Sequence, residues 1–150
     1  MNGDIFESEA ECLVNPVNCV GVMGKGLALE FKRRYPDYFV AYKEICDNLN
    51  LKSGIFAFHG FKNKYGKDFI SFPTKYHWSE QSDLSSIAAS LRLFSERYFD
   101  FPDQSYAFPA LGCGLGGLEW NDVFKIMKIY LEPLPIICEI YPPKEKVNEK

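Results

Sequence analysis

Residues 107–120 read AFPALGCGLGGLEW, so an apolar run is followed at once by a glycine-rich loop and a helix start. Glycines between a strand and a helix let consecutive backbone N–H groups converge, and the dipole of the following helix adds positive potential. Such a loop can bind phosphate without a cation. No Lys or Arg lies between Phe99 and Asp122, so backbone amides would have to hold the phosphate. The stretch indicates a phosphate-bearing ligand, with a plain surface loop as the simpler alternative.

Length and composition favour one domain. The chain has 150 residues, 47% of them hydrophobic, enough to bury about two-thirds of the unfolded surface. The net charge of −3 argues against a protein that binds nucleic acid over its whole surface. No apolar run approaches the length of a membrane span. We expect a monomeric domain over residues 1–150, away from membranes, whose charged tail at 142–150 is frayed.

Cysteine and histidine usage argues against a disulfide framework and a metal site. The five cysteines are odd in number and widely spaced, and none forms a C-x-x-C pair. Only two histidines are present. The N-terminus has no signal-peptide pattern. We therefore expect reduced thiols in a cytoplasmic protein, with no metal and no cofactor.

Hydrophobic spacing predicts alternating strands and helices. Strands are expected at residues 11–15, 55–58, 68–72, 105–108 and 136–141. Helices are expected at residues 27–35, 37–48, 84–98 and 120–131, the third capped by Ser82 or Asp83. The polar turn at 62–67 would join two strands into a hairpin. The fold class is α/β, with three layers, α/β/α, around a central mixed, largely parallel sheet.

Four unusual segments follow the predicted strands. They are residues 15–26, 72–78, 109–117 and 141–143. In open α/β sheets, ligands bind beyond the carboxyl ends of the strands, so these segments should share one rim. None has the P-loop pattern of a nucleotide hydrolase. The G-x-G-x-x-G of Gly112, Gly114 and Gly117 comes too late for a dinucleotide fold, because only 33 residues follow it.

Three motifs in this order resemble the macro domain family, the α/β/α fold that binds ADP-ribose. The motifs are LVNPVN followed by GVMGKGLA at 13–28, FPTKYHW at 72–78 and LGCGLGGLEW at 111–120. They are most similar to the branch that contains the terminal ADP-ribose glycohydrolase and the macro domains of DNA ADP-ribosyl glycohydrolase antitoxins. The resemblance covers nearly the whole chain and implies the macro domain fold.

The resemblance also implies an ADP-ribose site. Asp4 would accept a hydrogen bond from the adenine amino group beside the backbone of Ile5, and Tyr141 would stack on adenine or flank it. Asn18 would bind the hydroxyls of the distal ribose. The remaining expected contacts, to the diphosphate and that ribose, are Gly24, Lys25, Gly26, Thr74, Leu111, Gly112, Cys113, Gly114, Leu115 and Gly116.

Lys75 and His77 are the candidate catalytic residues. The resemblance implies that Lys75 is essential and acts at the anomeric carbon of the distal ribose. Partial desolvation would make its amine a better nucleophile or proton carrier. Without the resemblance, a solvated lysine that contacts phosphate is the simpler interpretation. His77 would assist as acid, base or substrate contact, with a structural role as the alternative.

Gly116 departs from one pattern within this branch. Human-type relatives that act on proteins carry a catalytic aspartate after Gly-Cys-Gly-Leu, and Glu119 lies three residues too late to replace it. No paired-carboxylate mechanism is therefore available at that position. This difference favours a lysine-centred mechanism and an ADP-ribosylated DNA base as the substrate.

We therefore expect an ADP-ribosyl glycohydrolase, a hydrolase that removes ADP-ribose from a modified macromolecule, here single-stranded DNA. The alternatives are a non-catalytic ADP-ribose reader and a hydrolase of Glu- or Asp-linked ADP-ribose on proteins or of ADP-ribose 1″-phosphate. Basic residues at 32–34, together with Lys62, Lys64 and Lys67, are candidates for DNA backbone contacts. A solvated helix face and a hairpin tip explain these charges equally well.

Overall fold

The computed structural model describes residues 3–49, 51–52, 54–114 and 116–143. Within these ranges, five strands form one sheet in the order β2-β3-β1-β4-β5. The strands are β1 (Cys12–Val17), β2 (Ala57–His59), β3 (Asp68–Pro73), β4 (Ser105–Phe108) and β5 (Ile137–Ile140). β1 pairs parallel with β3 and β4, β4 pairs parallel with β5, and β2 is antiparallel to β3. The predicted mixed, largely parallel sheet is confirmed.

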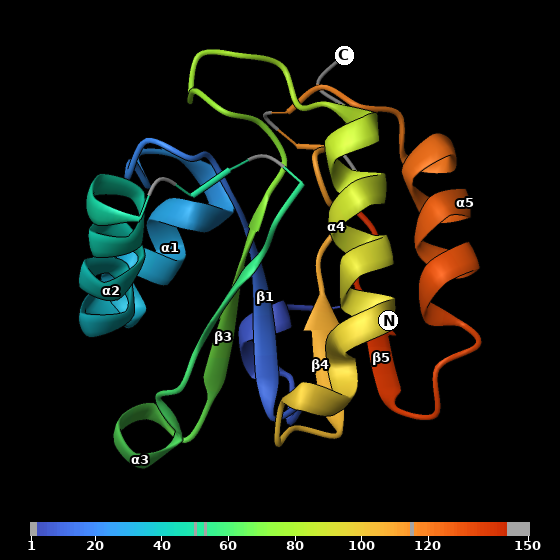
Figure 1. Cartoon of the computed structure of the whole chain (residues 1–150), viewed down its shortest axis with the longest axis horizontal. Coiled ribbons are helices and arrows are strands. Elements are labelled where there is room, and N and C mark those ends of the chain that lie inside the picture. Colours follow the sequence, from blue (N-terminus) through green and yellow to red (C-terminus); the bar gives the residue numbers. More distant parts are fainter. Residues whose placement is uncertain (1–2, 50, 53, 115, 144–150) are drawn as a thin grey trace.

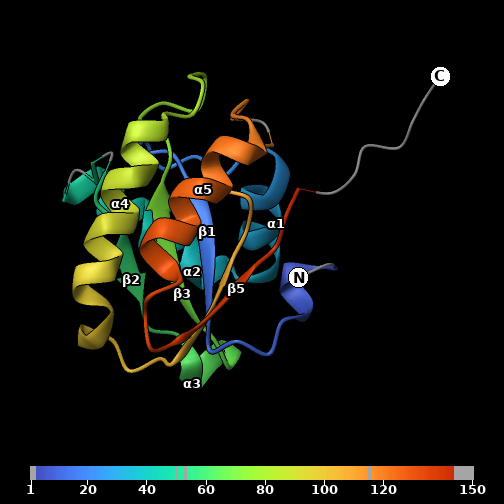
Figure 2. The same ribbon diagram turned by 90° about the vertical axis from the view of Figure 1, so that its right-hand side faces the viewer.

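Helices cover both faces of this sheet (Figures 1 and 2). On one face lie α1 (Gly26–Arg34) and α2 (Pro36–Asn48), and on the other lie α4 (Leu84–Arg97) and α5 (Trp120–Leu131). The shorter elements are η1 (Ile5–Glu7), α3 (Lys62–Tyr65) and η2 (Tyr98–Asp100). This arrangement confirms the predicted three-layer α/β/α fold.

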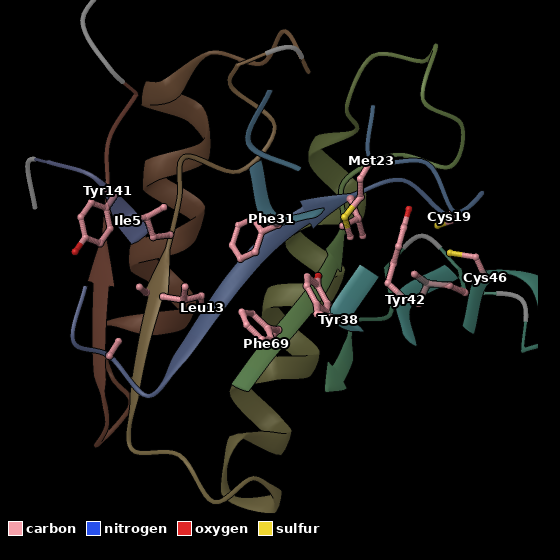
Figure 3. Close-up of a cluster of buried hydrophobic side chains, with 14 residues drawn as sticks. Ile5, Leu13, Cys19, Met23, Phe31, Tyr38, Tyr42, Cys46, Phe69 and Tyr141 are labelled. Atoms are coloured by element: carbon pink, nitrogen blue, oxygen red, sulfur yellow. The ribbon is translucent and has the colours of Figure 1, made fainter. Parts of the chain in front are cut away.

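Two hydrophobic clusters fill the spaces between the layers. Successive side chains of a strand point to opposite faces, so Leu13 packs with Phe31 and Phe69 under α1 and α2 (Figure 3). Val14 instead joins the cluster under α4 and α5, with Phe94. Because the central strands are covered on both faces, all six residues of β3 are buried. This packing fixes the sheet whose carboxyl edge carries the candidate site.

Local differences from the predicted elements have simple causes. Pro36 separates α1 from α2 and occupies the first turn of α2, where its missing N–H costs nothing. The expected turn at 62–67 contains the one-turn helix α3, because Asp68 Oδ1 accepts hydrogen bonds from the N–H groups of Phe61 and Lys62. Of the two proposed caps for α4, Asp83 is the one used, accepting from the N–H of Ser85 at 3.0 Å.

Two observations concern the described ranges alone. None of their helices has the length and apolar character needed to cross a bilayer. Nor do they contain a group of three or more His, Cys, Asp or Glu side chains placed to hold a metal ion. From residue 144 onward, the predicted frayed tail lies outside the described residues.

Candidate functional site

The loops that carry the predicted site residues meet at one edge of the sheet. Because β1, β3, β4 and β5 are parallel, their carboxyl ends point the same way, toward the top of Figure 1. Residues 18–25, 74–83, 109–119 and 141–143 follow these strands in turn. This is the edge at which open α/β sheets bind ligands.

The loop after β3 is tied to the loop after β1 at the position of Lys75. The N–H of Thr74 donates to the carbonyl of Val17 at 3.0 Å, and the N–H of Cys19 donates to the carbonyl of Tyr76 at 2.7 Å. The backbone on both sides of Lys75 is therefore fixed. Its side chain is half-buried, and its ammonium has no hydrogen-bond or ion-pair partner within the described part of the chain. Lys75 is held in place by its backbone while its amine is available to a ligand.

Asn18 shapes the loop after β1. It is 6% exposed. Its Oδ1 accepts hydrogen bonds from the N–H groups of Val20 and Val22 and from the hydroxyl of Tyr42, the last at 2.7 Å, while its Nδ2 donates to the carbonyl of Val22 at 2.7 Å. An amide nitrogen carries two hydrogens, so one is left for a ribose hydroxyl. Tyr42 is a site-supporting residue that the sequence did not reveal, because its position matches an ordinary apolar helix position.

The glycine-rich loop after β4 has the geometry of a phosphate cradle. Gly112 and Gly117 adopt φ values of +71° and +80°, which favour glycine. The loop is closed by a hydrogen bond of 2.9 Å from the N–H of Leu118 to the carbonyl of Gly112. Among the residues that the structure describes, the N–H groups of Gly112, Gly114 and Gly116 donate no hydrogen bond. Free amides gathered in one loop are the donors that an anionic phosphate requires.

The N-terminus of α1 is a second source of free amides at this edge. Lys25 occupies the N-cap position without a side-chain cap, and no acidic residue lies in the first turn. Gly24 and Lys25 are exposed, and Gly26 adopts a φ of +59°. The first N–H groups of a helix have no partner within the helix, and its dipole makes this end positive. The expected residues Gly24, Lys25 and Gly26 thus lie where an anion is favoured.

Ser82 explains why residue 116 is glycine. A Cβ placed on Gly116 would lie 2.1 Å from Ser82 Oγ and 2.6 Å from the carbonyl oxygen of Gly112. Ser82 is buried, its N–H donates to the carbonyl of Gly116 at 2.9 Å, and its hydroxyl donates to Thr74 Oγ1 at 3.2 Å. The space that an aspartate side chain would need is filled by this serine. Sequence reasoning treated Ser82 only as a possible helix cap and missed this contact.

The residues expected at the adenine end lie together beside β5. Asp4 Oδ1 accepts from the N–H of Phe6 at 2.9 Å and so caps η1. Ile5 is buried next to Tyr141 (Figure 3). The Tyr141 hydroxyl donates to Glu139 Oε1 at 3.0 Å, and the residue is only 7% exposed. A ring so covered offers little face for stacking, so flanking adenine is the arrangement that its position favours.

The sequence matches the macro domain family over residues 14–127. This chain belongs to the macro domain family. The DNA ADP-ribosyl glycohydrolase of Mycobacterium tuberculosis is 42% identical over 144 residues, which cover 95% of this chain and 41% of that protein. The chain therefore spans less than half the length of this curated relative.

Solved structures agree with this family. The macrodomain of Mycobacterium tuberculosis DarG superposes with a TM-score of 0.89 at 41% identity, covering 96% of this chain and 99% of that one. Thermosipho africanus DarTG in complex with ADP-ribose superposes with a TM-score of 0.92 at 39% identity, covering 97% of this chain and 41% of that one.

The other predicted residues of the macro domain lie at the same edge. His77 Nδ1 lies 2.8 Å from Ser79 Oγ and accepts from the N–H of Ser79 at 3.2 Å, so this ring nitrogen is engaged within its own loop. Burial raises the pKa of the Cys113 thiol to about 11, which keeps it protonated at neutral pH. Thr74 and Leu111 are buried, so they support the loops from beneath. Leu115 lies outside the described residues.

Three of the basic residues considered for DNA contacts, Lys62, Lys64 and Lys67, lie away from the candidate site. Lys62 and Lys64 belong to α3, at the amino end of β3 and far from the candidate site (Figure 1). Lys62 forms ion pairs with Glu11 and Asp103, and Lys64 pairs with Asp37. Lys67 donates to the carbonyl of Ser8 at 2.6 Å. These charges stabilise the far end of the macro domain.

Proposed function

We propose that this macro domain is an ADP-ribosyl glycohydrolase that removes ADP-ribose from single-stranded DNA. The name of the Mycobacterium tuberculosis relative, a DNA ADP-ribosyl glycohydrolase at 42% identity, supports DNA as the substrate. The observation that carries the proposal is the position of Lys75, whose backbone is fixed on both sides and whose amine has no partner among the described residues. The gathered free amides of the glycine loop supply the diphosphate site beside it.

In the proposed complex, ADP-ribose lies along the carboxyl edge of the sheet. Asp4 and Tyr141 hold adenine at the β5 end. The free amides of the glycine loop and of the α1 N-terminus bind the diphosphate. Asn18 uses its remaining N–H on the distal ribose, and the anomeric carbon of that ribose faces Lys75.

The reaction adds water across the glycosidic bond. The bond between the anomeric carbon and the DNA base breaks, the hydroxyl group of water ends on the carbon, and a proton ends on the base. Lys75 acts either by bonding to the carbon before water does or by carrying the proton. No carboxylate can assist from residue 116, because Ser82 fills that space. Borohydride trapping of a lysine adduct would identify the nucleophilic route.

The test is release of ADP-ribose from two substrates, an ADP-ribosylated single-stranded oligonucleotide and a protein with ADP-ribosylated glutamate. We expect release from the DNA alone. Lys75→Ala should lower kcat by about 10²- to 10⁴-fold while calorimetry shows ADP-ribose binding largely intact. Lys125→Ala, an exposed lysine on α5, is the control and should keep full activity. Binding without release from either substrate would make the domain a reader, and release from the protein would change the substrate class.

We also propose that the domain acts as a monomer in the cytoplasm. The support is compositional, because all five cysteines are free thiols in the structure. Analytical ultracentrifugation at micromolar concentration tests the oligomeric state, and a sedimentation coefficient of a dimer would contradict it.

A further inference from the structure

Two large aromatic side chains are exposed directly beside Lys75. Tyr76 is 57% exposed and Trp78 is 53% exposed, in the loop that projects above the sheet edge in Figure 1. Single exposed apolar residues are common on protein surfaces and need no explanation. Here, two exposed aromatic rings lie within three residues of a candidate catalytic lysine, on a loop outside both hydrophobic clusters. This arrangement is less common.

Hydrogen bonds hold the backbone that carries these rings. Glu80 Oε1 accepts hydrogen bonds from the N–H groups of Tyr76 and His77, at 3.2 and 2.9 Å, and the N–H of Glu80 donates to the carbonyl of His77 at 3.0 Å. The His77 ring lies against that of Trp78, with 5.1 Å between centroids and 33° between planes. Aromatic rings on a fixed backbone lose less conformational entropy when they bind than rings on a mobile loop do.

The proposed reaction determines what passes over this surface. The bond to be broken joins the anomeric carbon, which faces Lys75, to a DNA base, so the rest of the strand must leave the site next to Lys75. Trp78 is three residues from Lys75, a separation that spans at most about 11 Å of extended chain. About three stacked nucleotides at 3.4 Å each span the same distance. Tyr76 and Trp78 are therefore within reach of the nucleotides that flank the modified one.

We infer, on the basis of the proposed DNA substrate, that Tyr76 and Trp78 form a stacking platform for the unmodified bases that flank the ADP-ribosylated base. Every base has a π face, so aromatic rings bind single strands with little dependence on sequence. In a duplex those faces are covered by neighbouring base pairs, so the platform selects single-stranded DNA. Lys25, exposed across the edge, supplies a positive charge for the backbone phosphates.

The platform predicts that turnover depends on strand length. A substrate with several flanking nucleotides uses the platform, and an ADP-ribosylated mononucleotide, which has no flanking base, does not. The platform binds nucleotides remote from the reacting bond. Loss of a ring should therefore raise KM for the longer strand and leave kcat unchanged.

The experiment compares the same ADP-ribosylated base in a 12-nucleotide strand and in a mononucleotide. Trp78→Ala and Tyr76→Ala should each raise KM for the longer strand by about five- to 100-fold, with the mononucleotide unaffected. Trp78→Phe keeps a stacking ring and should restore most of the difference. Phe99→Ala is the matched control, since Phe99 is 69% exposed on η2 at the opposite end of the molecule.

The outcomes separate the two proposals. Equal KM values for wild type and Trp78→Ala on the longer strand would overturn the platform while leaving the proposed function intact. An equal loss on both substrates would also overturn it, because the defect would then lie in the ADP-ribose site. If the wild-type domain released ADP-ribose from neither DNA substrate, the proposed function would fail and the platform with it.

Discussion

At the scale of single residues, the candidate site depends on buried side chains that lie behind its loops. Ser82 and Tyr42 are both buried, and each uses its hydroxyl to position a loop that contacts ADP-ribose in the proposed complex. Neither could be found from the sequence, because a serine before a helix predicts a cap and a tyrosine in an apolar stripe predicts core. Their partners are distant in the chain, and only the folded structure brings them together.

Gly116 provides the sharpest steric test. Gly116→Ala places a Cβ 2.1 Å from Ser82 Oγ, an overlap that should cost about 1–3 kcal/mol of stability and weaken ADP-ribose binding. The measurements are thermal unfolding and calorimetry.

Gly114→Ala is the matched control for this substitution, because a Cβ on Gly114 has no neighbour within 4 Å. Its stability should be close to that of wild type. The double variant Ser82→Gly with Gly116→Ala should recover only part of the stability, because the carbonyl oxygen of Gly112 would still lie 2.6 Å from the new Cβ. Equal stability of Gly116→Ala and Gly114→Ala would mean that Ser82 does not restrict residue 116.

Tyr42 tests the support beneath Asn18. Tyr42→Phe removes a buried hydroxyl that donates to Asn18 and should cost about 1–3 kcal/mol of stability, because the Asn18 oxygen loses a partner. Affinity for ADP-ribose should fall as well, since the loop that carries Asn18 loosens. Tyr106→Phe removes a comparable buried hydroxyl, bonded to the carbonyl of Asp103 at the other end of the sheet. The Tyr106→Phe control should lose stability and keep its affinity for ADP-ribose. If Tyr42→Phe bound ADP-ribose as tightly as Tyr106→Phe does, Tyr42 would have no role in supporting the site.

At the scale of secondary structure, the sequence predicted elements with uninterrupted apolar periodicity well and the elements at the β2 edge of the sheet less well. The strand at 105–108 and the helix at 120–131 match β4 and α5, because their apolar periodicity is uninterrupted. β2 begins two residues later than predicted, and α3 replaces a turn. Both differences lie at this edge of the sheet, and at α3 the side chain of Asp68 holds the local backbone by accepting hydrogen bonds from the N–H groups of Phe61 and Lys62.

His59 makes β2 sensitive to pH. Burial lowers its pKa from 6.5 to about 4, so between these values the unfolded chain binds more protons than the folded one. Stability contributed by this group is therefore present above pH 6.5 and is lost as the pH falls toward 4. Between pH 6.5 and 5 the expected loss is about 2 kcal/mol. His59→Gln should show a correspondingly flatter pH dependence in urea unfolding; the same slope in both proteins would exclude His59 as the cause.

At the scale of the whole molecule, the two ends of the parallel strands differ in how their polar groups are paired. At the amino ends of the parallel strands, Lys62 and its carboxylate partners bind the loops to one another. The carboxyl ends instead keep amide groups and the Lys75 amine free within the described residues. The convergence of loops at this edge followed from the predicted largely parallel sheet, whose strands end at one rim. The free donors did not, because hydrogen-bond partners depend on three-dimensional distances.

Release of ADP-ribose from an ADP-ribosylated single-stranded oligonucleotide, compared between wild type and Lys75→Ala, tests the proposed function most directly. Wild type should release ADP-ribose, and the variant should bind free ADP-ribose with similar affinity while releasing almost none. Release by Lys75→Ala at the wild-type rate would contradict the lysine-centred mechanism, and no release by the wild type would contradict the proposed activity.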